Sequence, residues 1–393
     1  MDNKKSPCRQ ISFMLQKAIG APTLFLDFLP IELLSIVIGP YVEIEGTRGS
    51  KRPNLSLLLL SPPGIGKKTY LIGLIRRILG EFDHVEIVCP ATPEGLIDHI
   101  EGTKKGSYLI VLDELGRLMR REKTGRHYSS GLPEVIMKYL DGVREVLVYS
   151  QRGEIKRREI RGDVKFVCFI GASQDFFFDR EDLTGGWLRR MIVLSVRKND
   201  NPKGYLLEEG DIDPEEVIKI IVEWLKDILR WIWEEKEGRV KVRFSPEASE
   251  KINEISIAID KGERREYVSS LPRFLTIISA LIAVSKKRDR VEMEDVEEAE
   301  ELLRKASKGI REFLRRLRGE DNTLERMLRL VKKRSNGRPL DERTIYTGLR
   351  ISKDEAEEAL SLLEGVEVWR EGDKFYARYV PKELKDADDN SRE

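Results

Sequence analysis

A short segment rich in glycine and lysine holds residue types that bind phosphate. Residues 61–69 read SPPGIGKKT and lie between the apolar run LSLLLL and the helix-forming run YLIGLIRRIL. Glycines at 64 and 66 let the backbone curl so that its N–H groups and the N-terminus of the following helix face an anion, whose oxygens Lys67 would neutralise. The segment predicts a phosphate-binding loop; the alternative is a glycine-rich turn with a surface lysine. The residues expected at a nucleotide are Pro63, Gly64, Ile65, Gly66, Lys67, Lys68 and Thr69.

The segment departs from the usual phosphate-loop pattern, G-x-x-x-x-G-K-[ST], at two positions. The first position is Ser61, and Lys68 stands where a Ser or Thr hydroxyl holds Mg²⁺. A lysine cannot coordinate a cation, so we expect either Thr69 to reach the metal after a local shift or water to take that position. ATP binding with slowed hydrolysis is consistent with this change.

Two acidic residues end a second apolar run. The sequence YLIVLDEL spans residues 108–115, and Asp113 follows Lys67 by 46 residues (113 minus 67). We expect Asp113, together with Thr69, to hold the Mg²⁺ shell, and Glu114 to orient and deprotonate the attacking water. The alternative is a strand that ends in a solvated acidic pair. With the loop upstream, the pair predicts an ATPase that uses ATP and Mg²⁺.

Short apolar runs alternate with helix-like stretches around these residues. The runs cover residues 55–60, 85–88, 108–112 and 166–170, and such alternation implies a parallel sheet. The predicted fold class is α/β: a P-loop αβα core, followed by an all-α lid and a C-terminal winged helix. The expected domains are a helical lead-in interrupted at Pro30 and Gly39-Pro40 (1–50), the nucleotide-binding core (51–205), the lid (206–320), the winged helix (321–382) and a disordered tail (383–393).

The lid and the winged helix have local start and turn signals. Ser245 followed by proline at 246 predicts a helix start within the lid. Near the C-terminus, a capping box from Ser352 to Glu355 opens a helix, and VEVWREGDKFYARYV predicts a hairpin that turns at residues 372–373. The order of helices followed by a hairpin is that of a winged helix.

Composition limits the class of protein without naming a partner. The 393 residues include 70 Lys and Arg against 69 Asp and Glu, and charged residues make up 35%. Such dense, balanced charge is typical of thermophile proteins and fits a heat-adapted, archaeal source. The three cysteines and three histidines are scattered without metal-ligand spacing, which argues against a disulfide framework or a zinc site.

The N-terminal apolar stretch predicts buried helices rather than a membrane span. Residues 24–38 include Asp27, Pro30 and Glu32, and each charge costs about 3 kcal/mol at the centre of a bilayer. The N-terminus also lacks the order of charged, apolar and small residues that marks a signal peptide. We therefore expect a cytoplasmic protein without membrane contact.

Taken in order, these motifs resemble those of AAA+ ATPases. SPPGIGKKT is similar to the family's GPPGTGKTT, and LIVLDE to its second acidic motif. FVCFIGASQD resembles the strand whose polar residue, Ser173 or Gln174 here, helps to place the water. LTGGWLRRMIVLSV resembles the segment with an arginine finger, matched best by Arg190. The segments 244–255, 270–278 and 291–303 resemble the family's lid, with Arg273 in place of its nucleotide-sensing arginine.

Within that superfamily, the chain resembles minichromosome-maintenance-like helicases and the primase-associated ATPase domains of mobile elements. The lead-in, the insertion before the water-placing strand and the winged helix after the lid carry this resemblance. It implies a ring, expected to be a hexamer, that acts as a helicase or translocase in DNA replication. Two alternatives stay open: an initiator or loader that uses ATP as an assembly switch, as the GKKT variant suggests, and a signalling ATPase whose winged helix docks a protein partner.

A basic hairpin is the expected contact with DNA. Residues 145–162, EVLVYSQRGEIKRREIRG, alternate apolar and polar residues around a Gln-Arg-Gly turn. Helicases of the resembled branch hold phosphates with basic residues at this place, and the alternative is a solvated hairpin. The predicted recognition helix of the winged helix is acidic at 354, 355, 357 and 358, which favours protein docking or contact through its wing. The residues expected at DNA are Arg152, Lys156, Arg157 and Arg158.

Overall fold

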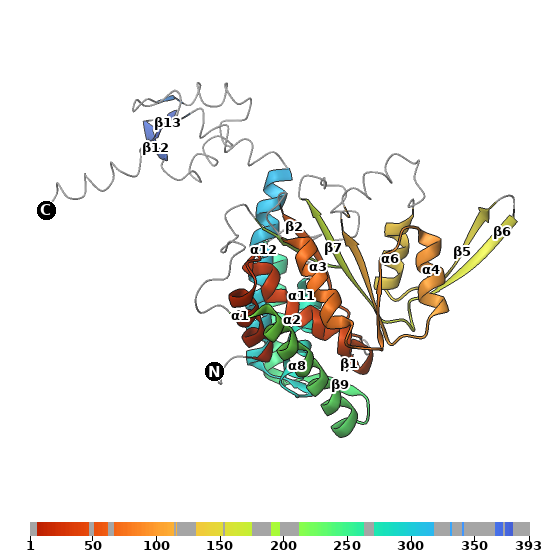
Figure 1. Ribbon diagram of the computed structural model, residues 1–393. Helices are drawn as coiled ribbons and strands as arrows, with labels where there is room; N and C mark the ends of the chain where they lie inside the picture. Colours follow the sequence, from red (N-terminus) through yellow and green to blue (C-terminus); the bar gives the residue numbers. More distant parts are fainter. Residues whose placement is uncertain are drawn as a thin grey trace. The chain divides into compact units, whose positions relative to one another are not determined.

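A computed structural model of the chain places its residues in two compact units, Met1–Ile310 and Arg311–Glu393 (Figure 1). The predicted lead-in and core, with nearly all of the predicted lid, thus share the first unit. The structure describes residues 6–46, 51–61, 67–113, 115, 131–151, 154–174, 190–196, 212–262, 271–317, 331, 340–341, 366–371 and 374–379.

The main sheet of the first unit is parallel throughout its described strands, as predicted. Its strands lie in the order β3-β4-β7-β2-β8. All four predicted strands are present, and a further one, β8, lies within residues 183–196, the segment assigned to the arginine finger. Their bounds are β2 (Ser56–Ser61), β3 (Val85–Val88), β4 (Ser107–Asp113), β7 (Val167–Gln174) and β8 (Ile192–Ser195).

The order of the strands creates a switch point beside β2. From β2 the chain passes through helix α3 (Lys68–Leu79) to β3 at the far edge, and returns through β4 and β7. It then continues to β8 on the other side of β2. In open α/β sheets, ligands bind outside the carboxyl ends of the strands at such a point. The predicted phosphate loop begins at this point, at the carboxyl end of β2.

Both faces of this sheet are buried, which explains its continuous apolar strands. On one face, alternate residues of β2 and β4, such as Leu57 and Val111, join the helical core. The other set, such as Leu58 and Ile110, is also buried and faces α4 (Pro93–Gly102) and α6 (Leu132–Leu140) (Figure 1). The helices that contribute buried residues to this helical core are α1 (Pro7–Ala18), α2 (Thr23–Ile38), α3, α8 (Pro214–Glu235), α9 (Pro246–Gly262), α11 (Leu271–Ser285) and α12 (Met293–Leu317).

Helix α2 corrects the prediction that the lead-in breaks at Pro30. The helix runs through Pro30 and ends at Ile38, followed by the short 3-10 turn η1 (Gly39–Tyr41). A proline removes one hydrogen bond from a helix, and packing on all sides of α2 offsets that loss. The stretch Thr23–Tyr41 is long and apolar enough to cross a membrane, but 83% of its apolar window is buried inside the protein. It therefore has the surroundings of a core helix.

The predicted all-α lid also needs correction, because it contains strands. Strand β9 (Val240–Phe244) pairs in parallel with β1 (Val42–Ile44) of the lead-in and with β10 (Arg290–Val291). Its sequence VKVRF alternates buried and exposed residues, the period of a strand. Helix α9 (Pro246–Gly262) begins where predicted, and the Ser245 hydroxyl accepts a hydrogen bond from the Ala248 amide at 3.1 Å.

Both predicted hairpins form. Strand β5 (Arg144–Gln151) pairs antiparallel with β6 (Glu154–Arg161), as the alternation of residues 145–162 predicted. In the second unit, β12 (Val366–Glu371) pairs with β13 (Lys374–Tyr379), which also pairs with β11 (Leu340–Asp341). The turn at 372–373, the helix expected to begin at Ser352 and the predicted tail lie outside the described residues.

Glu32 is a buried acid within α2. Its side chain is 0% exposed, and neither carboxylate oxygen has a hydrogen-bond partner among the described residues. Burial raises its pKa well above the ordinary 4.5. Because the pKa is higher in the folded state, stability is greatest below the unfolded pKa and is lost as the pH rises through the folded pKa.

We expect Glu32→Leu to raise the free energy of unfolding at neutral pH by about 1–3 kcal/mol, because an unsatisfied polar group leaves the core. The gain should be larger at about pH 8 than at about pH 5, where the wild-type acid is more fully protonated in both states. Urea denaturation at both pH values measures this, with the exposed Glu250→Leu as control. If Glu32→Leu lowers the free energy of unfolding at both pH values, the Glu32 carboxyl does not destabilise the core.

Candidate functional site

The carboxyl ends of three strands bring the predicted site residues to one edge of the sheet. In the strand register Ser61 lies beside Gln174, and Asp113 beside Ala172. Ser173 lies beside Leu60 and is buried. The edge therefore joins the start of the predicted loop, the metal-binding acid and the strand expected to place the water. Residues 62–66, Glu114 and the side chain of Gln174 lie outside the described residues.

Helix α3 points its N-terminus at this edge. It begins at Lys68, and Lys67 precedes it in the left-handed conformation, with φ of 43°. The Lys67 carbonyl accepts the first helical hydrogen bond, from the Leu71 amide at 2.9 Å. Burial lowers the pKa of the Lys67 ammonium. A helix N-terminus with two lysines attracts anions through its dipole, its N–H groups and their charge.

A hydroxyl and a carboxylate meet where the metal was predicted. The Thr69 hydroxyl donates a hydrogen bond to Asp113 Oδ2 at 3.3 Å, and both residues are exposed. Oxygen donors of these two types are those that Mg²⁺ takes from proteins, with phosphate oxygens and water completing its shell. No group of three His, Cys, Asp or Glu residues suited to a metal occurs among the described residues. The pair thus offers two oxygen donors to a metal.

Lys68 reaches back to the start of the loop. Its ammonium donates to Ser61 Oγ at 2.6 Å and lies 3.4 Å from the Ser61 carbonyl oxygen. The side chain thus connects the end of β2 to the beginning of α3, the two ends between which the loop runs.

Arg190 lies at the opposite end of the sheet, just before β8. Its guanidinium binds the Asp141 carboxylate with two hydrogen bonds, one from Nε at 2.7 Å and one from Nη2. Asp141 follows the last residue of α6 and precedes a glycine with φ of 66°. This partner could not be predicted from the sequence, because an Asp-Gly pair predicts only a turn.

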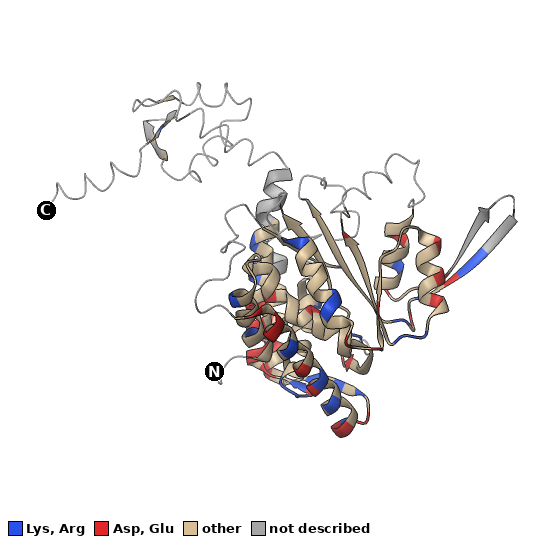
Figure 2. Ribbon diagram, in the orientation of Figure 1, with Lys and Arg blue, Asp and Glu red and all other residues tan. Residues whose placement is uncertain are grey.

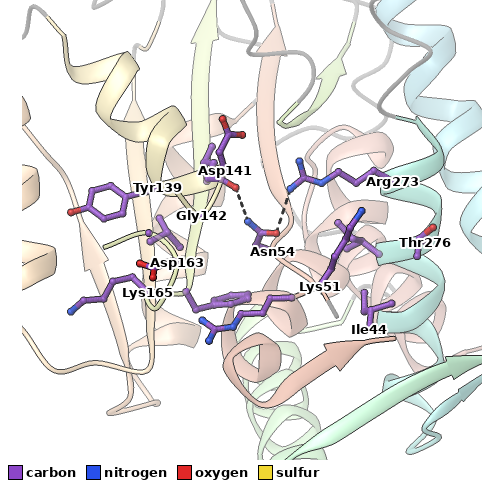
Figure 3. A pocket seen from close by; sticks show the side chains of 16 residues that line it. Ile44, Lys51, Asn54, Tyr139, Asp141, Gly142, Asp163, Lys165, Arg273 and Thr276 are labelled. Atoms are coloured by element: carbon purple, nitrogen blue, oxygen red, sulfur yellow. Dashed lines mark hydrogen bonds between the residues drawn. The ribbon is translucent and has the colours of Figure 1, made fainter. Parts of the chain in front are cut away.

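Arg273 corrects the expectation that it would lie at the phosphate loop. Its Nη2 is 3.5 Å from the Asn54 side-chain oxygen, two residues before β2 begins (Figure 3). At about 3.3 Å per residue, β2 separates that position from Ser61 by roughly 17 Å or more. Burial lowers the Arg273 pKa, the Asp141 charge raises it and the Arg190 charge lowers it. Arg273 and Arg190 thus gather around Asp141.

A pocket of about 600 Å³ opens beside this cluster. Figure 3 shows Asn54 between Asp141 and Arg273, where its side-chain nitrogen donates to the Leu140 carbonyl oxygen at 3.1 Å. Lys51 and Arg52 add positive charge to the lining, and Asp163 adds negative charge. The pocket and the end of β2 are separate places on the first unit.

The hairpin residues predicted at DNA differ in their surroundings. Arg158 forms a bidentate pair with Asp98 of α4, with Nη2 to Oδ2 at 2.7 Å, and hydrogen bonding to Asp98 raises its pKa. Arg157 is exposed on the neighbouring strand position. Figure 2 shows basic residues where the hairpin extends past α4. Arg152 and the side chain of Lys156 lie outside the described residues.

No protein-family model matches this chain, and no curated protein matches it.

The chemistry of the edge at β2 is compatible with a bound nucleoside triphosphate. Lysines and a helix N-terminus attract anions such as phosphate, and Thr69 and Asp113 offer oxygens of the kind that Mg²⁺ takes from proteins. Buried Ser173 supplies a polar group at the next strand end. The arginines at Asp141 are too far away to serve the same triphosphate.

Proposed function

We propose that the protein is an ATPase of the AAA+ type. The observation that carries the proposal is the Thr69–Asp113 contact, 3.3 Å long, at the N-terminus of α3 and beside the switch point of the sheet. ATP would place its phosphates against residues 62–69, and Mg²⁺, held by Thr69 and Asp113, would polarise the phosphates for attack. Glu114 would take the proton of the attacking water, with Ser173 or Gln174 orienting that water.

The proposal includes a ring, expected to be a hexamer. Arg190 lies at the amino end of β8, far from the ATP proposed for its own chain, so any ATP that it serves belongs to an adjoining subunit. Arg273 shares the Asp141 cluster and would act on the same neighbouring ATP. An arginine supplied by a neighbour stabilises the charge that develops on the transferred phosphoryl group.

The proposal also includes DNA as the substrate for movement, as a helicase or translocase would have. Support comes from the hairpin β5–β6, which forms where the sequence predicted it and keeps Arg157 exposed. Arg158 instead fastens the hairpin to α4. Arg157 would therefore hold phosphate, and Arg158 would hold the hairpin in position.

Steady-state ATP hydrolysis of the purified protein, with Mg²⁺ and with or without single-stranded and duplex DNA, tests the proposal. DNA-stimulated turnover is the expected result. Tight ATP binding without turnover under any condition would favour the ATP-switch initiator or loader. Turnover that ignores DNA would favour the signalling ATPase, and absence of ATP binding would overturn the proposal.

Arg157→Ala is expected to weaken single-stranded DNA binding several-fold, and to reduce its salt dependence because each subunit loses a phosphate contact. Fluorescence anisotropy at several salt concentrations measures both. Arg144→Ala is the matched control, since Arg144 lies on the same hairpin but pairs with Glu159 at 2.8 Å. Equal binding by the wild type and Arg157→Ala would remove this residue from the DNA contact.

A further inference from the structure

We infer that Lys68 and Thr69 form the lysine–hydroxyl pair of the phosphate loop, and that Lys67 is the last residue of the loop backbone. The sequence pattern instead assigns the lysine to Lys67 and leaves Lys68 in the position of the hydroxyl. The inference rests on the proposed function and changes which residue holds the phosphates.

The first observation is where the helix begins. In the phosphate-loop pattern a glycine precedes the lysine, and the hydroxyl follows it in the opening turn of the helix. Here α3 begins at Lys68, so Lys68 and Thr69 are its first two residues. Lys67 lies outside the helix with φ of 43°, a conformation that glycine adopts at far lower cost than other residues. Lys67 thus has the backbone of the pattern's glycine.

The second observation is the direction of the Lys68 side chain. Its ammonium lies 2.6 Å from Ser61 Oγ and 3.4 Å from the Ser61 carbonyl oxygen. Ser61 ends β2, so this side chain crosses from the helix to the first residue of the loop. The positive charge is therefore held between the two ends of the segment that the sequence predicts to bind phosphate. Residue 68 is therefore placed to neutralise phosphate oxygens.

The third observation is the contact between Thr69 and Asp113. Successive residues on a helix point about 100° apart, so only one residue at the start of α3 can face the carboxylate in this way. That residue is Thr69, whose hydroxyl is 3.3 Å from Asp113 Oδ2. In the pattern, the hydroxyl that holds the metal directly follows the lysine that holds phosphate. The residue directly before Thr69 is Lys68.

With this assignment, the metal position is intact. The departures from the pattern move to its two glycine positions, which become Pro62 and Lys67. Hydrolysis is then expected to proceed at an ordinary rate, instead of being slowed by a lysine in place of a metal ligand. The strained backbone at Lys67 is the remaining cost.

Binding of a fluorescent ATP analogue, with and without Mg²⁺, tests the assignment. Lys68→Met keeps most of the length of the side chain but removes its charge, and should weaken binding about 10- to 100-fold, the effect of losing a charge-assisted hydrogen bond. Thr69→Ala should lose the part of the affinity that depends on Mg²⁺. Lys67→Met should weaken binding by a clearly smaller factor than Lys68→Met does, because only a charge near the loop is lost. Lys67→Gly should unfold at a higher temperature than the wild type, because glycine adopts the left-handed backbone of residue 67 at lower cost.

The matched control is Lys104→Met, at an exposed lysine beyond the end of α4. Loss of binding in Lys67→Met with retention in Lys68→Met would overturn the assignment, and so would equal losses in the two. Circular dichroism of each variant separates lost binding from lost folding. If the wild type itself binds no ATP, the proposed function fails. That result differs from one in which the wild type binds ATP but binding depends on Lys67 instead of Lys68.

Discussion

Arg190→Ala is expected to lower ATP turnover by about 10³-fold or more while leaving the affinity for ATP unchanged. The residue binds Asp141 at the amino end of β8, on the far side of the sheet from Thr69 and Asp113. It therefore has no part in holding the ATP of its own chain in the proposed mechanism. Steady-state hydrolysis and equilibrium ATP binding measure the two quantities separately.

Mixing of subunits sharpens this test. Asp113→Asn protomers keep Arg190 but lose the metal carboxylate, and Arg190→Ala protomers keep the carboxylate but lose the arginine. Because an arginine of one protomer serves the ATP of the next, mixed rings of two inactive variants should regain turnover. Arg144→Ala, on the surface hairpin, is the control for removal of an exposed arginine. No recovery in rings shown to be mixed would place Arg190 outside catalysis in the neighbouring subunit.

Glu114→Gln is expected to reduce turnover by about 10²- to 10⁴-fold, because a glutamine orients water but cannot accept its proton. ATP should still bind with Mg²⁺, since Thr69 and Asp113 remain. Asp113→Asn is the informative comparison: it should lower both turnover and the Mg²⁺ dependence of binding. Unchanged turnover in Glu114→Gln would show that Glu114 is not the base that accepts the proton of the water.

The sheet could be predicted because each strand is a short apolar run that can be found without knowing its partners. Residues 85–88 form the strand predicted for them, and the other predicted strands differ from the observed ones by a few residues at their ends. The inner strands β2, β4 and β7 are buried on both faces, so their apolar residues run almost without interruption and a short window of sequence suffices. The hairpin β5–β6 was equally local, since its alternation and its turn lie within eighteen residues (162 minus 145, plus one).

The missed features depend on contacts between distant parts of the chain. Strand β9 is short, lies between two long helices and takes its partner β1 from the lead-in. Pro30 lies within a helix because neighbours surround that helix, which its own sequence does not record. The place of Arg273 depends on how α11 packs against α2 and β10, and no spacing along the chain fixes which end of the sheet it reaches.

In the phosphate loop, the sequence alone could not separate the roles of two adjacent lysines. Lys67 and Lys68 have the same chemistry, and a pattern search assigns them by counting from the glycines. What separates them in the structure is the residue at which α3 starts, together with the reach of Lys68 to Ser61. A helix start is among the least predictable features of a sequence when no Ser, Thr, Asp or Asn stands before it.

The pairing of β1 with β9 sets an order for synthesis of the protein. Val42 cannot pair until Val240 has been added, and the ribosome adds it 198 residues later (240 minus 42). Helix α2 packs against the neighbouring α1, but its contacts with α8 and α11 form only after those helices have been made. A nascent chain therefore carries α2 with part of its apolar surface uncovered, which slows folding and exposes the chain to aggregation. Production of this protein is expected to depend on chaperones that shelter such helices, and fragments that stop before residue 240 are expected to be insoluble.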